Sequence, residues 1–279
     1  MAASAYAYDY FNVSFPAEYV AHVEINRPEK LNAFIEIMWL NLSAIFTRLS
    51  HDASVRAIII SGAGDRAFSA GLDVQAASKT LTPAPDQDPA RFATFFRRHT
   101  LEFQACITAI EKCEKPVICI LHALSYGLAI DLSLACDIRL ATRSSALCVK
   151  EVDIGLAADV GTLSRLPHAV ANASWVKDVC LTARVFGADE AQRVGFVSGV
   201  LEGKAEAVGE ALKLARLIAS KSPVATMGTK EILNYSRDRP VADGLQYAAV
   251  WNAAMIQTQD VKDAMLSGLQ KRKPTFSKL

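Results

Sequence analysis

Two apolar patterns in the first half of the chain predict β-strands. Residues 11–15 and 19–25 alternate apolar and polar side chains on either side of a turn, which predicts a β-hairpin with one buried face. Residues 55–62 and 115–122 each contain an apolar run rich in Ile and Val, the pattern of strands buried on both faces. A shorter strand is expected at residues 137–142.

Apolar residues that recur every three or four positions predict helices between these strands. The pattern covers residues 32–50 and 91–113, and a shorter helix is expected at 128–136. Residues 78–89, which contain three prolines, predict an exposed loop, and residues 123–127 predict another. Because strands and helices alternate, the first two-thirds of the chain predict an α/β core.

The last third of the chain has a different pattern. From about residue 169 the sequence predicts mostly helix, most clearly at residues 205–220 and 241–265, with breaks at Ser222-Pro223 and Arg239-Pro240. We therefore expect a helical region appended to the core, suited to oligomerisation.

Length and composition allow one large domain or two. A chain of 279 residues with 51% hydrophobic content can bury a large core. We divide it into a core at residues 1–200 and a helical oligomerisation region at residues 201–279. With 30 basic and 29 acidic residues the net charge is +1, which argues against a surface for RNA or another polyanion.

Other features indicate an intracellular compartment. The six cysteines lie in apolar stretches without a C-x-x-C pair, so we expect buried, reduced thiols and no metal site. The N-terminus lacks the pattern of a secretory signal, and no apolar run is long enough to span a membrane. The chain ends in Ser277-Lys278-Leu279, the tripeptide that the peroxisomal import receptor binds, so the expected location is the peroxisomal matrix.

Residues 150–161 carry three carboxylates in an otherwise apolar, glycine-punctuated run that looks too hydrophobic for a solvated loop. A carboxylate surrounded by apolar side chains loses hydration, so its pKa rises and it can exchange protons near neutral pH. Glu151 and Asp159 are therefore candidate acid–base residues. The alternative is that these acids cap helices or pair with Lys150 and Arg165.

Two small-residue loops, each between a predicted strand and helix, could supply backbone N–H groups. One surrounds Gly71-Leu72 and the other surrounds Gly127-Leu128. Two N–H groups that converge on one point form an oxyanion hole. With carboxylates nearby, that arrangement suits removal of a proton beside a carbonyl group.

Several segments resemble the crotonase (enoyl-CoA hydratase/isomerase) superfamily, in the order expected for it: residues 26–33, 67–73, 115–117 and 135–139. Within the superfamily, residues 149–163 are similar to the signature of Δ3,5-Δ2,4-dienoyl-CoA isomerases. Three shorter segments resemble the same group: residues 222–225, 235–238 and 257–260. The resemblance implies a spiral of ββα units, a C-terminal helical trimerisation region, and a homo-oligomer that is a trimer or a dimer of trimers.

The resemblance also implies roles for single residues. The backbone N–H groups of Leu72 and Leu128 would bind the thioester oxygen of an acyl-CoA substrate. Glu151 would act as acid–base at C2, Asp159 as the second proton carrier, and Asp131 as their support. The expected substrate-binding residues are Ala70, Gly71, Leu72, Asp73, Val74, Leu128 and Lys30. Coenzyme A would be part of the substrate, and no separate cofactor is expected.

One departure from the family concerns residues 123–130, which retain a single glycine, so Leu124 and Tyr126 could narrow the acyl tunnel. His122 is interpreted as a packed strand-end residue. The implied reaction moves a proton from C2 to C6 of a 3,5-dienoyl-CoA without adding water. The alternatives are an enoyl-CoA hydratase or Δ3-Δ2-enoyl-CoA isomerase, or a non-catalytic CoA-thioester-binding or RNA-binding relative.

Overall fold

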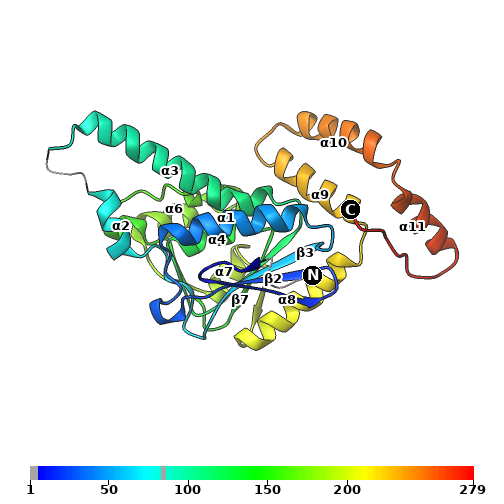
Figure 1. Ribbon diagram of the computed structural model, residues 1–279, viewed down its shortest axis with the longest axis horizontal. Coiled ribbons are helices and arrows are strands. Elements are labelled where there is room, and N and C mark those ends of the chain that lie inside the picture. The colour runs from blue at the N-terminus through cyan, green and yellow to red at the C-terminus, as the bar shows by residue number, and fades with distance from the viewer. Residues whose placement is uncertain (1–5, 83–85) are drawn as a thin grey trace.

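The computed structural model describes residues 6–82 and 86–279, with the side chains of residues 79–81 left out. Two β-sheets form its core, surrounded by helices (Figure 1). The six-stranded sheet has the order β1 (Phe11–Ala17), β2 (Val20–Ile25), β3 (Ala57–Gly62), β5 (Val117–Leu121), β7 (Ile138–Thr142) and β10 (Gly199–Leu201). The four-stranded sheet has the order β4 (Ala67–Ser69), β6 (Leu124–Tyr126), β8 (Ala146–Cys148) and β9 (Phe186–Gly187).

From β3 to β8, successive strands along the chain alternate between the two sheets. β1 and β2 form the predicted antiparallel hairpin, and β2, β3, β5, β7 and β10 run parallel. β3, β5 and β7 are each followed within a few residues by β4, β6 and β8, which pair in parallel in the second sheet. Each pair is one turn of a spiral of ββα units, which confirms the predicted fold class.

Helices cover both sheets, and their bounds agree with most of the sequence predictions. In the first part of the chain they are α1 (Glu36–His51), α2 (Val74–Leu81), α3 (Pro89–Lys112) and α4 (Leu128–Ala135). They continue with α5 (Thr162–Ala169), α6 (Ala173–Thr182), α7 (Ala188–Arg193) and α8 (Lys204–Ala219). The C-terminal helices are α9 (Pro223–Ser236), α10 (Val241–Met255) and α11 (Gln259–Leu269). None of the helices among these residues is long and apolar enough to cross a membrane.

Three local predictions were wrong. The loop expected from residue 78 begins inside α2, and part of it, residues 83–85, lies outside the described residues. The loop expected at 123–127 contains β6. The region after residue 169 is mostly helical, as predicted, and also contains the short strands β9 and β10. The single helix expected at 241–265 is two helices, because Thr258 accepts a hydrogen bond from the N–H of Asp260 and begins α11.

α8 packs on the outer face of the six-stranded sheet. Its buried stripe consists of small residues four positions apart: Ala207, Ala211, Ala215 and Ala219. Small side chains let the helix approach the sheet closely. α8 lies C-terminal to residue 200, the predicted division of the chain, and yet belongs to the packing of the core; that division stays a prediction.

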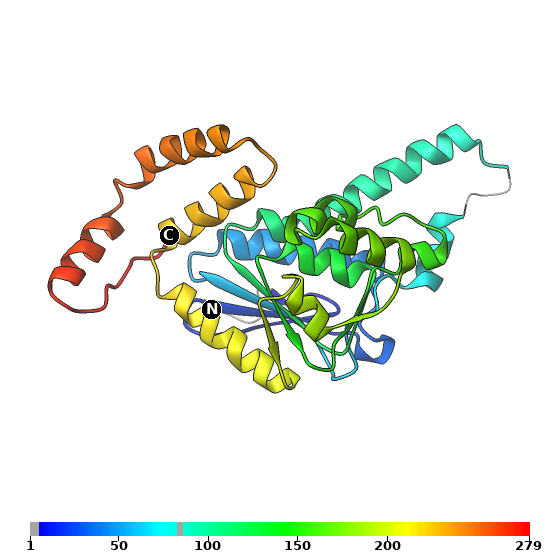
Figure 2. The same ribbon diagram turned by 180° about the vertical axis from the view of Figure 1, so that it is seen from behind.

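α9, α10 and α11 extend to one side of the body, and the N-terminal half of α3 extends to the other side (Figures 1 and 2). α9 is joined to the core by an ion pair, in which the Nζ of buried Lys230 lies 2.8 Å from a carboxylate oxygen of the partly exposed Asp137. The C-terminal segment returns to the core, where the Arg56 guanidinium donates hydrogen bonds to the carbonyl groups of Phe276 and Ser277.

Candidate active site

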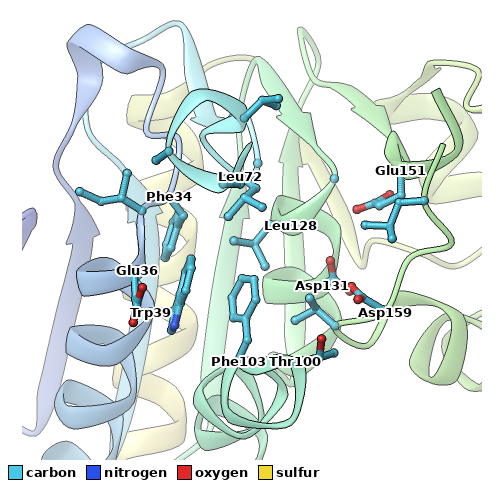
Figure 3. Close-up of a pocket in the computed structure, with 18 of the residues that line it drawn as sticks. Phe34, Glu36, Trp39, Leu72, Thr100, Phe103, Leu128, Asp131, Glu151 and Asp159 are labelled. Atoms are coloured by element: carbon cyan, nitrogen blue, oxygen red, sulfur yellow. The ribbon is translucent and has the colours of Figure 1, made fainter. Parts of the chain in front are cut away.

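A cavity of about 430 Å³ lies between α1, α3, the start of α4 and the segment that follows β8. Aromatic and aliphatic side chains form most of its wall, and Asp131, Glu151 and Asp159 contribute carboxyl groups (Figure 3). The structure therefore brings together the three acids that the sequence singled out.

Glu151 begins the short 3-10 helix η3 (Glu151–Ile154) and lies against Gly127. A Cβ atom added at Gly127 would be only 3.2 Å from Oε1 of Glu151, so a glycine leaves room for this carboxyl. The other oxygen, Oε2, is buried and has no hydrogen-bond partner among the described residues. Burial raises the pKa of Glu151, and the charge of Asp159 raises it further.

Asp159 lies in the segment between η3 and α5. Its backbone carbonyl accepts a hydrogen bond of 2.5 Å from the Gln104 side chain, which fixes this segment to α3. Burial raises the pKa of the Asp159 carboxyl, and the charge of His99 on α3 opposes that rise. Glu151 and Asp159 are thus two partly desolvated carboxyls in one cavity.

Asp131 lies behind these two acids, in the first turn of α4, and is 2% exposed. One of its carboxylate oxygens accepts hydrogen bonds from the backbone N–H and the hydroxyl of Thr162, at 2.6 and 2.8 Å. Burial raises the pKa of Asp131 to about 7, with a further contribution from the charge of Glu151. These contacts fit the supporting role of Asp131, which stays a prediction.

The two small-residue loops lie side by side at the cavity wall. Gly71 has φ +95°, and a Cβ atom added there would be 2.8 Å from the carbonyl oxygen of Tyr126 and 3.5 Å from the N atom of Leu128. Glycine is therefore required for this close approach. No backbone hydrogen bond from the N–H of Leu72 or Leu128 is found within residues 6–82 and 86–279. Their role as an oxyanion hole stays a prediction.

The expected substrate-binding residues divide into two groups. Ala70, Gly71, Leu72, Val74 and Leu128 line the cavity.

The other two, Asp73 and Lys30, do not line the cavity. Asp73 caps α2 by accepting from the N–H of Ala76, and it pairs with Arg27 at 2.8 Å. The Arg27 guanidinium lowers the pKa of Asp73. This ion pair is a structural contact that the sequence did not predict. Lys30 is exposed, and its role in binding CoA stays a prediction.

The alternative that the acids of residues 150–161 pair with Lys150 or Arg165 holds only for Asp153 among the described residues. Lys150 forms an ion pair with Asp153, and Arg165 pairs with Glu111 at 2.8 Å. These cations are therefore engaged away from Glu151 and Asp159. The expectation that the segment is shielded from solvent was wrong for its middle part, where Ile154 is 53% exposed.

The aromatic wall comes from residues that the sequence analysis did not assign to the site. Phe34 precedes α1, Trp39 lies on α1, and Phe103 lies on α3; Trp39 and Phe103 stack with ring centroids 4.1 Å apart. Their apolar spacing predicts burial, but no sequence signal distinguishes a cavity wall from a packed core. Leu124 and Tyr126, expected to narrow the tunnel, are not among the residues that line this cavity.

His122 is a packed residue, as expected. It is 2% exposed, and its Nε2 lies 3.0 Å from the carbonyl oxygen of Gly64. Burial lowers its pKa to about 4, which keeps the imidazole neutral. No group of three or more potential metal ligands occurs within the described ranges.

The fold and the cavity define an α/β protein of the crotonase class, with paired carboxyls in an apolar cavity. The family described as enoyl-CoA hydratase/isomerase matches residues 17–278, and the chain belongs to this family. A crystal structure of an enoyl-CoA hydratase from Bacillus anthracis is similar with a TM-score of 0.87 and 25% identity, covering 96% of this chain and 99% of that one.

Two curated relatives carry a narrower name. The chain is 43% identical to the mitochondrial Delta(3,5)-Delta(2,4)-dienoyl-CoA isomerase of Rattus norvegicus, a match that covers 99% of this chain and 85% of that protein. It is 40% identical to the peroxisomal Delta(3,5)-Delta(2,4)-dienoyl-CoA isomerase of Arabidopsis thaliana, a match that covers 93% of each.

Proposed function

We propose that the chain is a Δ3,5-Δ2,4-dienoyl-CoA isomerase, which moves a proton from C2 to C6 of a 3,5-dienoyl-CoA. The observation that carries the proposal is that Glu151 and Asp159 both enter one apolar cavity with raised pKa values. The names of relatives that match nearly the whole chain support the same function. Coenzyme A belongs to the substrate, and no separate cofactor takes part.

Glu151 starts the reaction. Its ionised carboxylate removes the C2 proton, which the neighbouring thioester makes acidic. A carboxylate with a raised pKa is the stronger base, so desolvation favours this step. The resulting negative charge spreads over the diene and onto the thioester oxygen, where the N–H groups of Leu72 and Leu128 donate hydrogen bonds to it.

Asp159 completes the reaction by giving its proton to C6. This step requires Asp159 to be protonated while Glu151 is ionised, and burial together with mutual repulsion favours one protonated carboxyl over two ionised ones. The apolar wall formed by Phe34, Trp39 and Phe103 excludes water, which favours isomerisation over hydration.

The absorbance of the thioester tests the proposal, because the conjugated 2,4-dienoyl product absorbs at longer wavelength than the 3,5-dienoyl substrate. We expect the wild-type protein to convert a 3,5-dienoyl-CoA, and both Glu151→Gln and Asp159→Asn to lose at least about 100-fold in kcat. Circular dichroism checks that the variants are folded. A wild-type protein that hydrates a 2-enoyl-CoA and leaves the diene unchanged would be a hydratase, contrary to the proposal.

We also propose a homo-oligomer, a trimer or a dimer of trimers, built through the C-terminal helices. Large apolar side chains are exposed along α9–α11: Leu233, Val241, Leu245, Val250, Ile256, Met265 and Leu269. An exposed apolar surface of this kind is typical of a protein interface. Light scattering should give a multiple of three chains, and Leu245→Glu should reduce the mass; a monomeric wild type would contradict the proposal.

Import into peroxisomes is the proposed location, directed by Ser277-Lys278-Leu279 where this tripeptide is the free carboxyl terminus. All three residues are exposed, as a receptor requires. The relatives include both mitochondrial and peroxisomal proteins. A fluorescent protein fused before residue 1 should enter peroxisomes and lose that location when the tripeptide is deleted; mitochondrial fluorescence would contradict this proposal.

A further inference from the structure

The proposed reaction leaves the two carboxyls in the wrong protonation states for another turnover. Glu151 has gained the proton from C2, and Asp159 has lost a proton to C6. Before the next substrate reacts, Glu151 must release a proton and Asp159 must receive one. The cavity wall around the two carboxyls is largely apolar, so few side chains can pass a proton to Asp159.

His99 is the titratable residue best placed to supply that proton. It lies on α3 and lines the same cavity as Asp159, and the charges of the two groups interact. It also lines a second, adjacent recess together with Glu36, Phe95, Arg98 and Glu102. These four recess residues are all exposed. His99 therefore joins the reaction cavity to a solvent-facing surface.

Both partners are held in place. The imidazole stacks on Phe95 with ring centroids 6.2 Å apart and contacts Trp39 edge-on at 5.9 Å. The same helix holds the backbone of Asp159 through Gln104, at 2.5 Å. α3 thus carries the imidazole and also holds the backbone of the segment that carries the Asp159 carboxyl.

The other charged groups near His99 are less suited to this task. In the recess they are Glu36 on α1, and Arg98 and Glu102 on α3 itself. In the reaction cavity, besides Glu151 and Asp159, they are Lys150, which pairs with Asp153, and Asp131, whose carboxyl is held by Thr162. An ordinary glutamate has lost its proton at neutral pH, and an arginine does not release its own. An imidazole gains and loses a proton within the physiological range, and it can accept on one nitrogen while donating on the other.

We propose that His99 is a proton-relay residue, which carries protons from solvent to Asp159 between turnovers. The imidazolium donates its proton to the Asp159 carboxylate and then takes a proton from water in the recess. Glu151 releases the proton from C2 to solvent once the product leaves, so each cycle takes up one proton and releases one. This inference rests on the proposed isomerase function.

The test compares the first turnover with later ones in His99→Gln, which keeps a polar side chain but cannot carry a proton near neutral pH. With enzyme in excess over 3,5-dienoyl-CoA, we expect a single-turnover rate within about 2-fold of the wild type, because Asp159 starts protonated. With substrate in excess we expect a burst of one product per site and then a rate at least about 10-fold lower. Added imidazole should restore the steady rate.

Two further variants separate the relay from other effects. His99→Asn repeats the test with a shorter side chain in case the Gln variant misfolds. Arg98→Gln removes a charge from the same recess without altering the reaction cavity, and it should turn over like the wild type.

The outcomes are distinguishable. Equal loss in the first and later turnovers would make His99 a structural residue, and no loss in either would also overturn the relay. A wild-type protein with no first turnover would instead overturn the isomerase function itself.

Discussion

Replacing Gly71 by alanine tests whether the close approach of two loops forms the oxyanion hole. Gly71 has φ +95°, and its added Cβ would lie 2.8 Å from the carbonyl oxygen of Tyr126 and 3.5 Å from the N atom of Leu128. A Cβ atom does not approach a backbone oxygen as closely as 2.8 Å, so either the loop with Gly71 or the loop with Tyr126 must move. The movement would separate the N–H groups of Leu72 and Leu128.

The expected effect has two parts of different size. A residue with a side chain in a left-handed conformation costs about 1–2 kcal/mol of folding free energy. Loss of one oxyanion-hole donor reduces kcat by about 100- to 1000-fold, equivalent to about 3–4 kcal/mol of transition-state stabilisation. We therefore expect Gly71→Ala to lose much more activity than stability.

Gly195→Ala is the matched control. Gly195 also has a positive φ, +82°, but an added Cβ there would have no atom within 4 Å. Urea denaturation should show a decrease in the free energy of unfolding for both variants, whereas dienoyl-CoA conversion should decrease steeply for Gly71→Ala alone. If Gly71→Ala keeps kcat within about 3-fold of the wild type, the donor geometry inferred from these loops is wrong.

Two further predictions concern buried charges. The pKa of Asp131 is raised to about 7, so the folded state holds a proton that the unfolded state releases near pH 4. The free energy of unfolding should therefore fall as the pH rises from about 4 to 7, by up to about 4 kcal/mol, and Asp131→Asn should flatten this dependence in urea titrations; an unchanged slope would contradict it. Lys230→Met should destabilise the fold by about 1–3 kcal/mol because it leaves the Asp137 carboxylate, whose side chain is 23% exposed, without its cation, and Lys230→Met with Asp137→Asn should recover part of that loss.

The local pattern of the sequence was sufficient for much of the architecture. The alternation in residues 11–25 and the apolar run in 55–62 reflect which faces of the strands are buried, and the three strands β1, β2 and β3 formed as predicted. Ser222-Pro223 separates α8 from α9, as the predicted break requires, and it begins α9 because proline suits the first helical turn and Ser222 accepts a hydrogen bond from the N–H of Ala225.

Tertiary contacts overrode the local pattern elsewhere. β6 forms at residues 124–126 because a parallel strand lies on each side of it, β4 and β8, and no nearby sequence signal reports those partners. Asp73 appeared to be a substrate contact, yet it pairs with Arg27, a residue 46 positions away. Such pairings depend on the path of the whole chain.

By itself, the sequence determined that Glu151 and Asp159 lie in an apolar segment, and that two glycine-containing loops follow strands. The tertiary structure decided which charges those acids meet. Lys150 pairs with Asp153, Asp131 is buried in the first turn of α4, and the charge of His99 on α3 acts on Asp159. Desolvation and electrostatic interaction depend on distance in space rather than along the chain, so the pKa values that make the site reactive arise only after folding.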